Sequence, residues 1–164
     1  MKRLILFSLV ICLTSILAGC SFYADVVIVN NSNDFLQISY QTKTPNYGGL
    51  APRFAPLSEF NVNRTEWREL SEDRYRIDKE SGTLEVKLAP NEALKIQSVD
   101  AGRAENNLDE ALNLKSLEIT AEKGSIILKG NQVYQQFKPE HKGWVLFGPK
   151  YSAYVLYYNE QKNQ

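Results

Sequence analysis

The sequence predicts a mainly β domain in which two antiparallel sheets pack face to face, with one or two short helices between the strands. Two observations predict this class. Apolar and polar residues alternate with a period of two in several short segments, and clusters of Asn, Asp, Ser and Gly separate these segments at close spacing. About eight such strands favour two packed sheets over alternating strands and helices. An open β-barrel built from the same strands is the alternative.

The first two predicted strands flank a polar turn. Residues 25–29 form a run of Asp and β-branched or apolar side chains, and residues 30–34 read Asn-Asn-Ser-Asn-Asp. Asn and Asp tolerate turn geometry and bond their own backbone, so this cluster predicts a turn. The strand over residues 35–42 has apolar side chains at every second position from Leu36 to Tyr40, which is typical of a half-buried strand.

The same alternation predicts the later strands. They cover residues 84–88, 94–97, 117–120 and 126–128, and Lys123-Gly124 marks a hairpin turn before the last of these. Residues 144–147 and 151–158 form the final two strands. The side chains expected to point into the core are Leu36, Ile38, Leu84, Val86, Leu88, Leu94, Ile96, Leu117, Ile119 and Leu128.

Two short helices interrupt the strands. Asn107, with Glu110 three residues later, has the spacing of a capping pair at the start of a helix. A second helix is expected within residues 130–138, because Val133 and Phe137 lie on one side, and Pro139 is expected to end it.

Residues 43–63 form a long connection rich in Pro and Gly, with aromatic residues between them. A connection of this length is uncommon in a compact domain and is often functional. We expect an edge crossover whose aromatic side chains pack on the sandwich, and a recognition loop is the alternative.

The N-terminal segment is typical of targeting. Lys2 and Arg3 precede an apolar run over residues 4–17, which is shorter than the about 20 residues that a membrane-spanning helix needs. The run ends in Leu17-Ala18-Gly19-Cys20, which resembles the lipobox of bacterial lipoprotein precursors. An uncleaved signal anchor is the alternative.

This resemblance implies how the chain is processed. Residues 1–19 correspond to a lipoprotein signal peptide, and Cys20 corresponds to the residue that becomes the mature N-terminus and carries a diacylglyceryl group, often with an acylated amine. Residues 20–23 then form the lipidated cysteine and a short tether. Ser21 stands where Asp usually signals retention in the inner membrane. The resemblance therefore implies the cell envelope, with the outer membrane, facing the periplasm, as the location in a Gram-negative host.

The rest of the chain is expected to be one domain. Residues 24–158 form the sandwich and residues 159–164 a polar tail. Cys12 leaves with the signal and Cys20 is lipidated, so the mature domain is expected to have no thiol and to depend on burial and hydrogen bonding. The polar turn at residues 30–34 and the segment 88–94, Leu-Ala-Pro-Asn-Glu-Ala-Leu, resemble loops of immunoglobulin-like bacterial domains. That resemblance implies an immunoglobulin-like β-sandwich.

Charge and composition exclude several function classes. The chain has 19 basic and 19 acidic residues, which are interspersed, so no basic patch indicates a nucleic-acid partner. A single histidine, His141, and no cysteine in the mature domain make a zinc site unexpected. The 30–34 turn is no calcium loop, because Phe35 stands where such a loop needs Gly. No metal and no cofactor are predicted, and the chain contains no Gly-x-Ser-x-Gly motif.

Aromatic side chains provide the candidate binding surface. Its members are Tyr47, Trp67, Tyr75, Tyr154 and Tyr158. Strand alternation places Tyr154 and Tyr158 on one face and Tyr151 and Tyr157 on the other, so one set belongs to the core. Exposed aromatic patches often mark binding sites.

The function expected from these features is a non-enzymatic accessory or binding module. The lipid on Cys20 would join it to the membrane, and its partner would be an unknown envelope protein or glycan. The alternative is an envelope enzyme acting on glycans, using two of the carboxylates of Glu66, Glu69, Glu72 and Asp73 around Trp67. Such an enzyme needs two carboxylates about 5–10 Å apart across a groove. A purely structural envelope protein is a third possibility.

Overall fold

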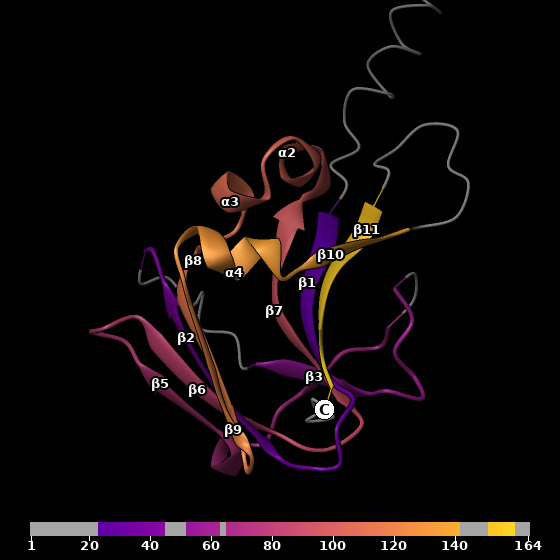
Figure 1. Ribbon diagram of the computed structural model, residues 1–164. Coiled ribbons are helices and arrows are strands. Elements are labelled where there is room, and N and C mark those ends of the chain that lie inside the picture. Colours follow the sequence, from indigo (N-terminus) through magenta and orange to yellow (C-terminus); the bar gives the residue numbers. More distant parts are fainter. Residues whose placement is uncertain (1–22, 45–51, 63–64, 142–150, 160–164) are drawn as a thin grey trace, which may run out of the picture.

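The computed structural model describes residues 23–44, 52–62, 65–141 and 151–159 (Figure 1). These residues form two sheets that face each other, with short helices gathered at one end. The six-stranded sheet has the order β10-β11-β1-β7-β3-β4 and the five-stranded sheet has the order β5-β6-β2-β8-β9. Every described pair of neighbouring strands is antiparallel except β1 and β11, which are parallel. The predicted β-sandwich is confirmed.

The strands have the following bounds. The six-stranded sheet contains β1 (Tyr23–Asn30), β3 (Arg53–Pro56), β4 (Arg68–Glu69), β7 (Glu92–Asp100), β10 (Lys138–His141) and β11 (Tyr151–Tyr158). The five-stranded sheet contains β2 (Leu36–Thr42), β5 (Tyr75–Asp78), β6 (Thr83–Leu88), β8 (Leu114–Ala121) and β9 (Gly124–Lys129).

The main core lies between the two sheets, where the predicted alternation holds. Of the ten side chains expected to point inward, all are buried except Ile96, which is half-buried against the core. The pairing of β7 with β1 shifts register between Val26 and Val27, which face Gln97 and Lys95. Ile96 therefore sits in a β-bulge, where regular alternation of the side chains is interrupted.

A second apolar cluster covers the outer face of the six-stranded sheet. Val27 and Val29 of β1 lie in it, while Val26 and Ile28 point into the main core. Leu57, Phe60, Val62 and Trp67 from the connection around β3 and β4 pack against this outer cluster. Strand β1 is thus buried on both faces, which explains why its sequence is a continuous apolar run.

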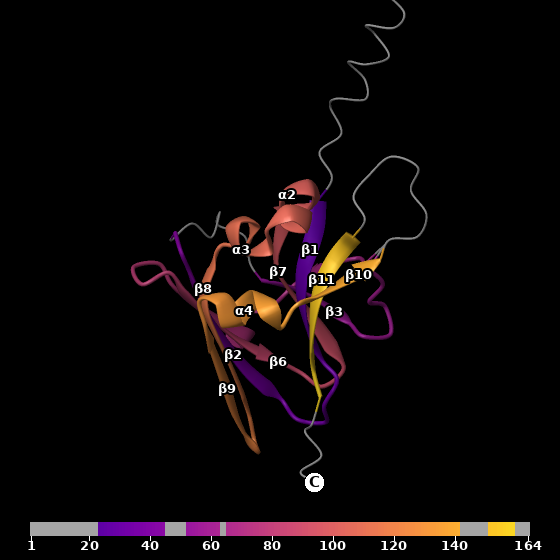
Figure 2. The same cartoon turned by 45° about the horizontal axis from the view of Figure 1, so that its top comes forward.

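Within the described residues, three short α-helices and one 3₁₀ turn accompany the sheets. They are α2 (Ala101–Asn106), α3 (Leu108–Ala111), α4 (Asn131–Gln135) and η1 (Glu72–Arg74). The Asn107 side chain caps α3 by accepting a hydrogen bond from the Asp109 N–H at 3.1 Å, so the predicted helix start is confirmed. The Asn107 N–H donates to the Arg103 backbone oxygen at 2.9 Å instead of to Glu110, so the reciprocal half of the expected capping pair is not formed. Figure 2 shows α2, α3 and α4 side by side at the end of the sandwich where β1 begins.

Two details differ from the predictions. The helix expected within residues 130–138 ends at Gln135, and Pro139 lies inside β10 instead of ending the helix. Pairing of β10 with β11 ends the helix, because the chain after Phe137 is drawn into the sheet. The connection expected over residues 43–63 also contains a strand, β3, which pairs with β7. The strand predicted over residues 144–147 lies outside the described residues.

Asn30 joins two corners of the sandwich. Its side chain is fully buried, and its Nδ2 donates to the backbone oxygens of Asp34 at 2.8 Å and Ala89 at 3.0 Å. Its Oδ1 accepts from the Ser32 hydroxyl at 2.6 Å and from the Ser32 N–H at 3.1 Å. One amide therefore fastens the β1–β2 turn to the β6–β7 turn, with every polar atom satisfied.

Candidate functional site

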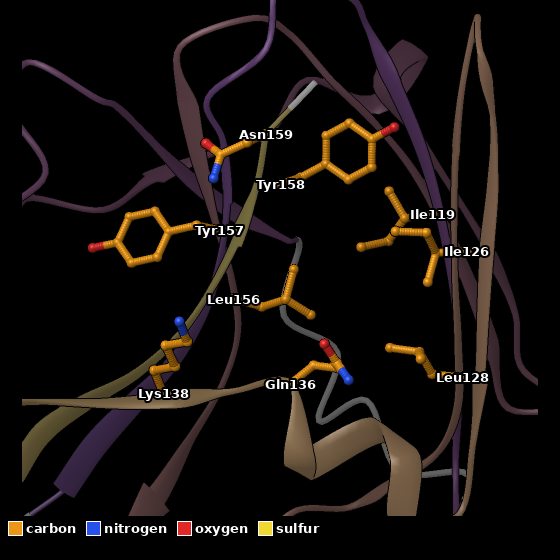
Figure 3. Close-up of a pocket in the computed structure, with 9 residues that line it drawn as sticks. All are labelled: Ile119, Ile126, Leu128, Gln136, Lys138, Leu156, Tyr157, Tyr158 and Asn159. Carbon is orange, nitrogen blue, oxygen red and sulfur yellow. The ribbon is translucent and has the colours of Figure 1, made fainter. Parts of the chain in front are cut away.

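A groove opens between the two sheets along one side of the sandwich (Figure 3). Its volume is about 340 Å³, at the lower end of the range of about 300–1,000 Å³ typical of ligand pockets. Strands β8 and β9 supply one wall, and the end of β11 supplies the other. The residues that line the groove are Ile119, Ile126, Leu128, Gln136, Lys138, Leu156, Tyr157, Tyr158 and Asn159.

Alternation along the β8–β9 hairpin places the apolar wall. Ile119 pairs with Ile126, and Leu117 pairs with Leu128, so these side chains share one face of the sheet. Ile119 and Leu128 are buried at the bottom of the groove, and Ile126 is 38% exposed at its rim. Figure 3 shows Ile119, Ile126 and Leu128 facing Leu156 across the groove.

The opposite wall exists because β10 is shorter than β11. Pairing between these strands begins with Lys138 opposite Val155, so the described part of β10 does not extend beside Leu156–Tyr158. Leu156 and Tyr158 pack against the main core on the face that looks into the groove. The sandwich is therefore left open beside this end of β11.

Polar groups lie at the rim. Gln136, which follows α4, lies at one end of the groove and Asn159 lies at the other (Figure 3). The Tyr157 side chain points away from the apolar wall (Figure 3), on the same face of β11 as Val155 of the outer cluster. It is 43% exposed, and its hydroxyl donates to Oε1 of Glu140 at 3.4 Å. Burial raises the pKa of Tyr157, and the nearby Glu140 carboxylate raises it further, so the phenol remains a donor at neutral pH. Of the described residues that line the groove, Lys138 alone is charged.

Trp67 lies elsewhere, over the outer face of the six-stranded sheet. Its indole N–H donates to Oδ2 of Asp25 at 2.9 Å, and its ring centroid is 6.1 Å from that of Phe60. The Asp25 carboxylate also accepts from the Ser98 hydroxyl at 2.7 Å and pairs with Lys95 Nζ at 2.8 Å. These contacts anchor the connection that carries Trp67 to the sheet.

The acidic residues around Trp67 lie on the surface of the same connection and the turn after it. Glu66, Glu69, Glu72 and Asp73 are all exposed. The carboxylate that accepts a hydrogen bond from Trp67 belongs instead to Asp25 on β1, and Asp25 is far from Trp67 in sequence. Among the residues that the structure describes, no group of three or more His, Cys, Asp or Glu side chains is arranged to hold a metal ion.

The remaining predicted surface residues do not come together. Tyr154 is 4% exposed and belongs to the core, so its side chain offers no surface, whereas Tyr158 lines the groove. Tyr75 lies on β5, at the edge of the five-stranded sheet opposite β9, and is partly buried against the core. Tyr47 and Cys20 lie outside the described residues.

Sequence reasoning missed most of the groove. Ile126 and Ile127 are adjacent in a predicted strand, so one apolar side chain must face each side of the sheet. Both are exposed, Ile127 by 56%. Apolar residues on both faces of a short strand were the signal that could have indicated a surface awaiting a partner.

Comparison of the chain with protein-family models, with curated proteins and with solved structures gave no match. In the part of the chain that the structure describes, no helix has the length and apolar character needed to cross a membrane.

Proposed function

We propose that this chain is a lipid-anchored cell-envelope protein whose sandwich is a non-enzymatic binding module held at the membrane surface. The observation that carries the proposal is the position of Leu17-Ala18-Gly19-Cys20 directly before the folded domain. Only Ser21 and Phe22 separate Cys20 from Tyr23, where β1 begins. Three residue steps reach roughly 11 Å when fully extended, so the domain would lie against the lipid.

Lipid on Cys20 would hold the protein firmly. Each buried methylene contributes about 0.8 kcal/mol, and two or more acyl chains are needed for stable anchoring. The diacylglyceryl group implied by the lipobox resemblance meets that need. Ser21, in place of Asp, supports the outer membrane as the location in a Gram-negative host, with the domain facing the periplasm.

The chemistry of the groove supports binding over catalysis. Its walls are apolar, its polar groups are neutral apart from Lys138, and its described lining contains no carboxylate. Binding sites are typically apolar with a few polar groups at the rim. The alternative of a glycan-acting enzyme needs two carboxylates facing each other. The Asp25 carboxylate, which lies beside Trp67, instead forms an ion pair with Lys95 and accepts a hydrogen bond from the Ser98 hydroxyl.

Replacement of each cysteine tests the anchor. Cells producing the wild-type chain, Cys20→Ser or Cys12→Ser are fed an alkyne-labelled fatty acid, and the protein is followed through membrane fractionation. We expect label and membrane association for the wild type and for Cys12→Ser, which serves as the matched control. Cys20→Ser is expected to lose the label and cleavage before residue 20. Acylation of the Cys20→Ser variant would contradict the proposal.

A further inference from the structure

We draw no further inference here: the strongest candidate, the apolar groove between β9 and the end of β11 with the adjoining edge of β9, is an unpartnered face, and nothing among the described residues shows what covers it.

Discussion

At the scale of the residue, Asn30 shows how a polar side chain can specify a β-sandwich. Its amide satisfies backbone oxygens on two turns that are far apart in sequence, and it is fully buried. No apolar residue of similar size can replace these bonds. The Asn-rich turn that the sequence predicted is therefore also a connection between the β1–β2 and β6–β7 corners.

Replacement of Asn30 by Ala is expected to lower the free energy of unfolding by roughly 1–3 kcal/mol, because buried carbonyl oxygens lose their donor. Denaturant titration of the purified chain measures the change. Asn31→Ala is the control, since the Asn31 side chain is exposed and bonds only Asn159 Oδ1 among the contacts described. Its effect is expected to stay within about 0.5 kcal/mol. Equal losses in the two variants would show that burial of Asn30 adds nothing.

Asp78 gives a second prediction at this scale. The Ser81 hydroxyl donates to its Oδ2 at 2.7 Å, and the N–H groups of Glu80 and Ser81 donate to Oδ1, so these bonds lower the pKa of Asp78. A lowered pKa in the folded state means that the carboxylate contributes stability above its unfolded pKa, and this contribution is lost as the pH falls through the folded pKa.

NMR titration of the Asp78 carboxyl carbon is expected to give a midpoint below the ordinary value of about 3.9. Ser81→Ala is expected to raise the midpoint, because the first cause of the shift is removed. Ser71→Ala removes an exposed hydroxyl elsewhere and is expected to change nothing. An unchanged midpoint in Ser81→Ala would assign the shift to other groups.

At the scale of the element, the strands with regular alternation could be predicted from sequence because their pattern is local. Strands β2, β6 and β8 each place alternate apolar residues against the same core. Strand β10 reads Lys-Pro-Glu-His and has no such pattern. It is a strand only because β11 lies beside it, and this pairing cannot be read from four residues. The same applies to β3, whose pairing with β7 was hidden in a segment rich in Pro and Gly.

The groove was unpredictable for the same reason. It depends on which strands form the sheet edges and on where β10 stops beside β11, and both are set by long-range pairing. Trp67 was identified as a notable side chain, but its partner Asp25 could not be, because 42 residues separate them in sequence.

Truncation of two core side chains compares the free energy of unfolding at a regular strand position with that at the β1–β7 bulge. Leu36→Ala is expected to cost about 2–5 kcal/mol of unfolding free energy, since its side chain is fully buried between the sheets. Ile96→Ala is expected to cost less, because Ile96 is half-buried at the β1–β7 bulge. Denaturant titration of both variants makes the comparison. A larger loss for Ile96→Ala would mean that the bulge is better packed than its exposure indicates.

At the scale of the whole molecule, stability is expected to be independent of reductant. If the signal peptide removes Cys12 and lipid occupies Cys20, no thiol remains in the mature chain. Thermal melting of the mature protein purified from membranes is expected to give the same midpoint with and without dithiothreitol. The Cys20→Ser chain, which is expected to retain Cys12, is the comparison. A midpoint of the mature protein that shifts with reductant would contradict the proposed processing.

The position of the helices determines how the groove would be oriented at a membrane. Tyr23 pairs with Asp100, directly before α2, so a lipid on Cys20 would turn the helical end toward the bilayer. Strand β9 runs from the hairpin at Glu122-Lys123 toward α4 and hence toward that end. The groove shares this direction, because Gln136 follows α4 at one end of it and Asn159 lies at the other end (Figure 3). A ligand in the groove would therefore have one end near the headgroups and the other end facing away from the leaflet.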